Sequence, residues 1–118
     1  GDGRVLEHYG FNDYPSGLLR STATDFARLM MALMDEGDPI MEGSSVALFE
    51  DARLFIEARA VGSGQGFGHD GGEAGVVSSF SYRHDGFGWF YVANGEFEND
   101  DDLDAFQRRL EARLAQEE

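Results

Sequence analysis

The sequence predicts an α+β fold in which helices pack on an antiparallel β-sheet, and three features carry that prediction. Two apolar runs, Val76 to Arg83 and Phe87 to Asn94, flank the tripeptide His84-Asp85-Gly86. An Asp-Gly pair between such runs is typical of a β-hairpin, because both residues tolerate the positive φ of tight turns. Amphipathic helical patterns precede and follow this hairpin, near residues 22–37 and beyond Asn99.

The second apolar run is predicted to be a central strand of the sheet. From Phe87 to Ala93 both alternating sets of side chains are apolar, which suits a strand that is covered on both faces. The first run alternates less regularly and is expected to lie beside it. A third strand is expected around Gly68, so the sheet should have at least three strands.

The first helix is predicted to begin at Ser21 or Thr22. Thr22 is followed three positions later by Asp25, which imitates a capping box and places a carboxylate at the positive end of the helix. Gly37 suits a C-terminal cap. The residues of one apolar face, which we interpret as core, follow helical spacing and are Phe26, Leu29, Met30, Leu33 and Met34.

A shorter second helix is predicted next, with Ser44 or Ser45 as its N-cap. Residues 52–61 fit either a continuation of this helix or a strand. The alternation from Leu54 to Val61 favours the strand. The glycine-rich turn that follows, residues 62–66, precedes no helix, which argues against a phosphate-binding loop.

The last helix is predicted behind the acidic run Asn99 to Asp102. Three arginines lie towards its C-terminal half, so the order of charges matches the helix dipole. The acidic run lacks the spaced ligands and the glycine of a calcium loop. The apolar stripe that should pack this helix across the sheet consists of Leu103, Phe106, Leu110 and Leu114.

Composition limits the possible partners. The chain has 118 residues, which suits one domain spanning residues 1–118. It carries 23 acidic residues, nine arginines and no lysine, and the resulting net charge of -14 argues against nucleic acid and anionic membranes as partners. No apolar run approaches the roughly 20 residues needed to span a bilayer.

Cysteine and histidine give no sign of a metal site or a cofactor. The absence of cysteine excludes disulfides and thiolate ligands. The three histidines are widely separated and no pair has the spacing of zinc ligands. We therefore expect no metal and no other cofactor, and we interpret His8 and His84 as surface or turn residues.

Two stretches of the chain occur together in an informative order, Pro15 to Arg28 and Gly68 to Ser79. Both resemble the C-terminal part of the serine β-lactamase and penicillin-binding-protein superfamily, and the class C β-lactamase and esterase-like branch most of all. In that family the first stretch leads into a helix beside the active site. The second is the His-x-Gly form of the third catalytic motif, on the strand that lines the substrate cleft. The resemblance extends from about Pro15 to the end of the chain.

The resemblance assigns roles to four residues. His69 would be a cleft-lining cation or hydrogen-bond donor, Gly71 would let substrate approach the strand, and the Gly72 N–H would be one of two oxyanion donors. Asp70 departs from the hydroxyl residue usual in the family. If it is ionised beside His69, it would repel a substrate carboxylate, which favours an esterase or amide hydrolase over a lactamase. A triad of Ser78, His69 and Asp70 is rejected, because adjacent strand residues point to opposite faces.

The rest of the family's machinery is absent from this sequence. Without lysine there is no Ser-x-x-Lys motif, in which the lysine assists deprotonation of the nucleophilic hydroxyl. None of the four tyrosines is followed by Asn two positions later. The resemblance thus implies a C-terminal fragment of a longer serine hydrolase whose substrates are small esters, amides or peptides, and which is inactive on its own.

A non-catalytic α+β binding or assembly module is the alternative. In a fragment, loss of the upstream half of the domain should leave apolar surface of the sheet or a helix exposed. Large exposed apolar patches usually mark contact sites, so the sequence predicts a homodimer or a higher homo-oligomer.

Overall fold

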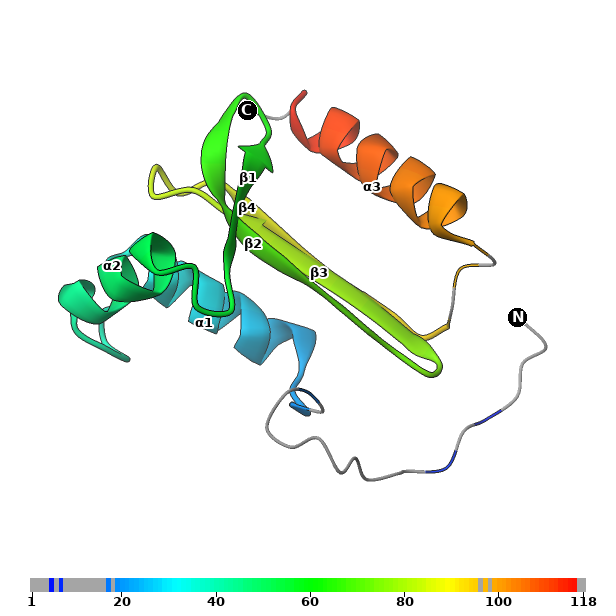
Figure 1. Cartoon of the computed structure of the whole chain (residues 1–118), viewed down its shortest axis with the longest axis horizontal. Helices are drawn as coiled ribbons and strands as arrows, with labels where there is room; N and C mark the ends of the chain where they lie inside the picture. Colours follow the sequence, from blue (N-terminus) through cyan, green and yellow to red (C-terminus); the bar gives the residue numbers. More distant parts are fainter. Residues whose placement is uncertain are drawn as a thin grey trace.

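The structure, a computed structural model, describes residues 5, 7, 17, 19–95, 97 and 99–116. His8 and the Pro15-Ser16 start of the first family-like stretch lie outside these residues. The four strands form one antiparallel sheet in the order β1-β2-β3-β4 (Figure 1), which confirms the predicted α+β fold. In chain order the elements are α1 (Ala23–Met34), α2 (Gly43–Asp51), β1 (Glu57–Val61), β2 (Gly64–Glu73), β3 (Val76–Tyr82), β4 (Gly88–Ala93) and α3 (Asp100–Leu114).

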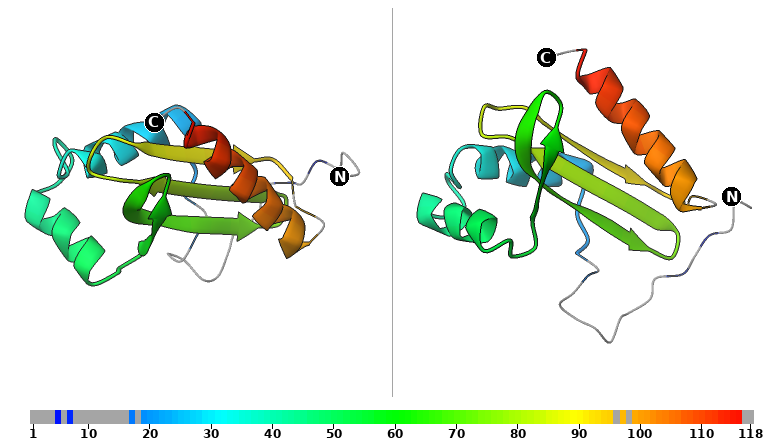
Figure 2. Two further views of the ribbon diagram at one scale, coloured as in Figure 1. Left: turned by 90° about the horizontal axis from the view of Figure 1, so that it is seen from above. Right: turned by 45° about the horizontal axis from the view of Figure 1, so that its top comes forward.

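The helices cover the two faces of the sheet unequally. Helices α1 and α2 pack on one face, and α3 lies over the other (Figures 1 and 2). Leu33, Val46, Ile56 and Tyr82 form the buried core between α1, α2 and the sheet. Helix α3 has no buried residue, so it packs on the sheet less closely than α1 and α2 do. No helix in the described part of the chain has the length and apolar character needed to cross a membrane.

The β3–β4 hairpin confirms the prediction from the Asp-Gly pair. The Arg83 N–H donates to the Phe87 carbonyl at 2.8 Å and closes the ladder. Gly86 has φ of 92°, which the turn requires and which glycine adopts without strain.

The prediction of a central strand from Phe87 to Ala93 is wrong, because β4 stands at one end of the strand order in the described residues. Its faces are nevertheless both covered, as the apolar pattern indicated. The Phe90 ring stacks on Phe26 of α1 with centroids 4.4 Å apart, and Tyr91 meets Phe106 of α3 edge-on at 5.1 Å. An apolar pattern indicates that both faces of a strand are covered, but it does not indicate whether both edges of that strand are paired.

Helix α1 follows its sequence signals. The Asp25 N–H donates to Thr22 Oγ1 at 3.1 Å, as the predicted cap requires. The helix ends at Met34, and Gly37, at φ of 95°, donates its N–H to the Ala32 carbonyl. The C-cap itself is Asp35, and the left-handed residue that follows it is Glu36, at φ of 52°, so Gly37 closes the turn one position beyond the predicted cap.

The predicted cap of α2 is wrong. The helix begins at Gly43, its N-cap is Glu42, and no side chain caps it. Ser44 and Ser45 lie inside the first turn instead. The N–H groups of residues 40 and 41 both bond to the Gly37 carbonyl, so the turn after α1 decides where α2 starts.

Residues 52–61 resolve into a turn followed by a strand. The strand was predicted from Leu54, but β1 starts three residues later at Glu57. The Leu54 N–H donates to the Phe49 carbonyl, and Arg53 and Phe55 both have positive φ. The start of the alternating pattern therefore belongs to the turn that ends α2.

Candidate functional site

The family-like motif, His69 to Gly72, lies on the second half of β2, where β1 no longer pairs with this strand. Strand β1 pairs with β2 only from Gly64 to Gly68. Strand β3 pairs with β2 on the other side as far as Glu73. From residue 69 to residue 73, therefore, one edge of β2 has no strand partner among the described residues.

The ladder pattern shows which backbone groups face this open edge. Arg83 and Phe87 form a hydrogen-bonded pair, so odd-numbered residues of β3 bond to β4 and even-numbered ones bond to β2. Ser78 stands opposite Gly71, so odd-numbered residues of β2 bond to β3 and even-numbered ones face outward. The Gly72 N–H thus points to the open edge, the orientation that an oxyanion donor requires.

The two glycines of the motif differ in their surroundings. A methyl group on Gly72 would meet no atom within 4 Å, so the space beside it is open. A methyl group on Gly71 would come to 2.7 Å from Ser78 Oγ. The space beside Gly71 is therefore partly filled by its own neighbour on β3.

His69 is exposed and lies on the face of the sheet that carries α1 and α2. Its cross-strand partner is Phe80, whose ring packs against Phe26 of α1. The His69 side chain makes no hydrogen bond or ion pair with any residue in the described part of the chain. Its ring is thus available to a ligand approaching from that face.

Asp70 lies on the opposite face, under α3, and its charge is balanced there. Its two carboxylate oxygens lie 3.1 and 3.4 Å from the Arg59 guanidinium nitrogens, and Ser79 Oγ donates to it. Burial raises the pKa of Asp70, but the hydrogen bonds from Ser79 and Arg59 and the charge of Arg59 outweigh burial and lower it.

This placement corrects the expectation that Asp70 repels a substrate carboxylate beside His69. Neighbouring residues of a strand point to opposite faces, and Arg59 neutralises Asp70 from the adjacent strand. The reason for preferring an esterase or amide hydrolase over a lactamase is therefore removed. The rejection of a Ser78-His69-Asp70 triad is confirmed by the same alternation.

A second polar cluster, which sequence reasoning missed, joins α1, α2 and the β3–β4 turn. The Tyr82 hydroxyl donates to Glu50 Oε1 at 2.8 Å, and His84 Nε2 lies 2.9 Å from the same oxygen. His84 Nδ1 lies 3.3 Å from the Met34 carbonyl. His84 is an exposed turn residue as expected, but its ring is held by two acceptors. No local signal reveals this, because Glu50 and His84 are 34 residues apart.

The cluster favours the charged form of His84. Burial lowers the pKa of His84, but the Glu50 hydrogen bond, the Met34 carbonyl and the charges of Glu50 and Glu36 together raise it. Both ring nitrogens face acceptors, and only the doubly protonated imidazolium can donate to both. Burial, followed by the hydrogen bond to Glu50, also raises the pKa of Tyr82.

The pairing of His84 predicts a specific dependence of stability on pH. Because the folded-state pKa exceeds the ordinary value of 6.5, the stabilisation is fully present below that value and is lost as pH rises through the folded pKa. The difference in unfolding free energy between the native chain and His84→Gln should therefore shrink as the pH rises above the ordinary value of 6.5. Urea titrations at several pH values measure it, and a constant difference would contradict the pairing.

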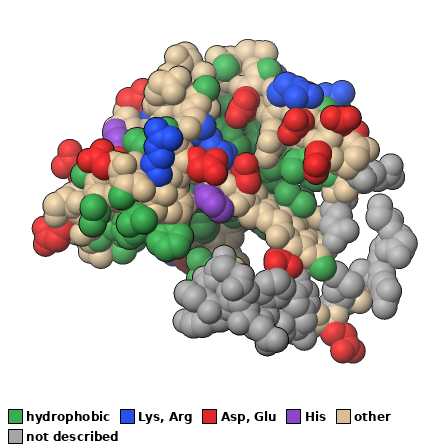
Figure 3. Space-filling view, viewed as in Figure 1, with side chains coloured by type: hydrophobic (Ala, Val, Ile, Leu, Met, Phe, Trp, Pro, Cys, Tyr) green, Lys and Arg blue, Asp and Glu red, His purple; other side chains and the backbone are tan. Residues whose placement is uncertain are grey.

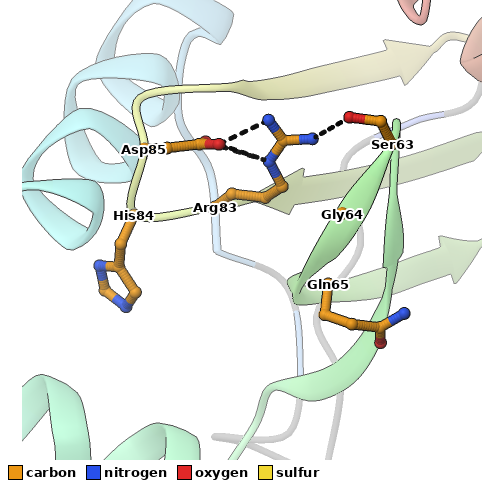
Figure 4. Close-up of a pocket in the computed structure, with 6 residues that line it drawn as sticks. All are labelled: Ser63, Gly64, Gln65, Arg83, His84 and Asp85. Carbon is orange, nitrogen blue, oxygen red and sulfur yellow. Dashed lines mark hydrogen bonds and ion pairs between the residues drawn. The ribbon is translucent and has the colours of Figure 1, made fainter.

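A shallow hollow opens beside this cluster, and its arginine is already ion-paired. It is lined by Ser63, Gly64, Gln65, Arg83, His84 and Asp85. Figure 4 shows the Arg83 guanidinium between Asp85 and Ser63, with the His84 ring pointing away. Arg83 also donates to the Val61 carbonyl at 2.9 Å. The ion pair between Arg83 and Asp85 thus fixes the side chains that line this hollow.

The described residues contain no group of three or more His, Asp or Glu side chains that could hold a metal ion. Comparisons of the chain with protein-family models, curated proteins and solved structures found no match.

Proposed function

We propose that this chain supplies the third-motif strand of a β-lactamase-like serine hydrolase. The observation that supports this most is the geometry of β2, where His69 has no side-chain partner among the described residues and the Gly72 N–H faces an edge that β1 leaves open. A strand edge of this kind can receive the carbonyl group of an ester, amide or peptide substrate. In this proposal His69 binds the substrate and Gly72 donates to the oxyanion.

The proposal places the remaining chemistry outside these 118 residues. Acyl transfer needs a nucleophile with an activating base, and this sequence has no lysine to serve as one. In the family that the chain resembles, the second oxyanion donor belongs to the nucleophilic serine. The chain would therefore contribute one wall of a cleft and half of an oxyanion hole.

The isolated chain is expected to form no acyl-enzyme. Loss of one oxyanion donor alone lowers the rate about a hundredfold to a thousandfold, and loss of the activated nucleophile adds to this. Incubation with an activated ester, a chromogenic β-lactam and a fluorophosphonate probe, followed by intact-mass measurement, should give no adduct. An active esterase serves as the positive control.

The opposite result would be equally clear. A stoichiometric adduct on a serine of the native chain that is lost in His69→Ala would mean that the chain holds a complete active site. The proposal that the nucleophile comes from elsewhere would then be wrong.

The second candidate function, a non-catalytic assembly module, is favoured by an apolar surface at the end of α2. Leu48 is 61% exposed, Leu54 45% and Phe55 80%. Hydrophobic side chains gather at this end of the molecule (Figure 3). Phe55 also holds a φ of 65°, a conformation that costs a residue with a side chain about 1 kcal/mol or more.

We accordingly propose that the chain forms a homo-oligomer through this surface. Light scattering at micromolar concentration should give a mass above the 13.0 kDa of one chain. Phe55→Ser should shift the population towards the monomer, whereas Val76→Ser, at an apolar site that is 36% exposed, serves as a control and should not. A 13.0 kDa species at every concentration would contradict this proposal.

A further inference from the structure

A glycine directly follows an aspartate or asparagine at three places in the described part of the chain. They are Asp70-Gly71, Asp85-Gly86 and Asn94-Gly95. In such a pair the glycine nitrogen can attack the side-chain carbonyl carbon of the residue before it and close a five-membered imide ring. Glycine favours this attack because it has no Cβ and restricts the backbone least. The attack also needs a glycine N–H that is not held in a hydrogen bond and a side-chain carbonyl that carries no charge.

The two Asp-Gly pairs fail both requirements. Asp70 and Asp85 each pair with an arginine, at 3.1 and 2.6 Å respectively. These arginines favour the ionised carboxylates, and an ionised carboxylate resists a nucleophile. Gly71 is an odd-numbered residue of β2, so its N–H bonds to β3. The Gly86 N–H donates to a carbonyl of the hairpin turn at 3.2 Å.

Asn94-Gly95 meets both requirements. The two residues directly follow β4, at the start of the connector that leads to α3 (Figure 1), and both are exposed. Neither the Gly95 N–H nor the Asn94 side chain makes a hydrogen bond with any described residue. The Asn94 side chain is an uncharged amide. A methyl group on Gly95 would meet no atom within 4 Å, so a ring has room to close there.

Asn99, the other asparagine that the structure describes, lies in the opposite situation. It is also exposed, but its side chain caps α3. Its Oδ1 accepts from the Asp102 N–H at 3.0 Å, and its Nδ2 donates to Asp102 Oδ2 at 3.0 Å. The residue that follows is Asp100, the first residue of the helix. The Asn99 side chain cannot turn towards that nitrogen without breaking the cap.

We propose that Asn94-Gly95 is a site of spontaneous modification, at which Asn94 loses ammonia and becomes aspartate or isoaspartate. The Gly95 nitrogen gives its proton to hydroxide and bonds to Asn94 Cγ, and the side-chain nitrogen takes up a proton and leaves as ammonia. Water then opens the imide. Its attack at Cγ gives aspartate, and its attack at the main-chain carbonyl gives isoaspartate, in which the backbone runs through the side chain.

Both products change the connector between β4 and α3. Each adds one negative charge, and isoaspartate also lengthens the connector by one carbon. Water and base are the only co-reactants, so this inference does not rest on the hydrolase proposal.

The test follows the two asparagines in the same molecule. The full chain is incubated at mildly alkaline pH, folded or unfolded in guanidinium chloride, and sampled over time. Cleavage after arginine releases residues 84–108, which contain both asparagines, and tandem mass spectrometry assigns the conversion to one or the other. Asn99 should react about fivefold or more slowly in the folded chain than in the unfolded chain, because its cap must open first. Asn94 should react within about threefold of its unfolded rate, because nothing holds it.

Two variants test the ring mechanism. Asn94→Gln would need a six-membered ring, so it should remove the product at this position, and an isoaspartate-specific methyltransferase should label the native chain but not this variant. Gly95→Val keeps Asn94 but places a branched side chain beside the attacking nitrogen, and should slow the conversion about tenfold or more. An unchanged rate in Gly95→Val would overturn the proposal. Slowing of Asn94 by folding to the same extent as Asn99 would overturn it as well.

Discussion

Replacing Gly68 with alanine is expected to destabilise the sheet by about 3 kcal/mol, whereas the same replacement at Gly72 should change stability very little. A methyl group on Gly68 would overlap the Phe80 carbonyl oxygen and come to 2.8 Å from Ser81 Oγ. The carbonyl belongs to the neighbouring strand β3, so it cannot move aside without breaking the ladder. At Gly72 the added methyl group meets nothing.

Urea denaturation followed by Trp89 fluorescence measures both variants on the same protein. Trp89 is 7% exposed and lies on β4, so it reports on the sheet as a whole. The comparison also separates the fold from the candidate site, because alanine at position 72 keeps the N–H that faces the open edge. Equal losses of stability in the two variants would contradict the tight packing around Gly68.

The features that could be predicted from the sequence are those fixed by residues close together in the chain. The hairpin turn follows from Asp85-Gly86. The start of α1 follows from Thr22 and Asp25, because the Asp25 backbone N–H donates to the Thr22 side chain three residues earlier. The opposite orientations of His69 and Asp70 follow from the alternation of any strand. Each of these is a local consequence of backbone geometry.

The features that could not be predicted depend on partners distant in sequence. Arg59 and Asp70 are eleven residues apart, and they meet only because β1 pairs with β2. The alternating pattern from Leu54 also gave no sign that the turn ending α2 would take its first residues. The position of β4 at an edge of the sheet depends on which other strands the chain forms. The apolar pattern of one strand carries no information about the other strands.

The pairing of Glu50 has the same long-range character, and its removal should have one of the largest effects on stability. Glu50→Ala is expected to destabilise the fold by about 3 kcal/mol. It leaves the hydroxyl of Tyr82, a fully buried residue, without its acceptor and takes from His84 its carboxylate partner. Hydrogen bonds to a charged group are worth about 1.5 to 3 kcal/mol, and an unsatisfied buried hydroxyl adds to the cost.

Glu57→Ala is the matched control, because Glu57 is also an ion-paired glutamate but its side chain is 70% exposed. Exposed ion pairs contribute about 0 to 1 kcal/mol, so this variant should unfold at nearly the native urea concentration. Tyr82→Phe removes only the hydroxyl and should cost about 1 to 1.5 kcal/mol.

A double-mutant cycle of Glu50→Ala and Tyr82→Phe then measures the interaction between the two residues. If the hydroxyl acts through Glu50, the Tyr82→Phe change should cost little or nothing once Glu50 is alanine, because the unsatisfied hydroxyl is removed as well. Full additivity of the two effects would mean that Tyr82 and Glu50 do not depend on each other. The contact between Tyr82 and Glu50 would then not be what stabilises the packing of α2 on the sheet.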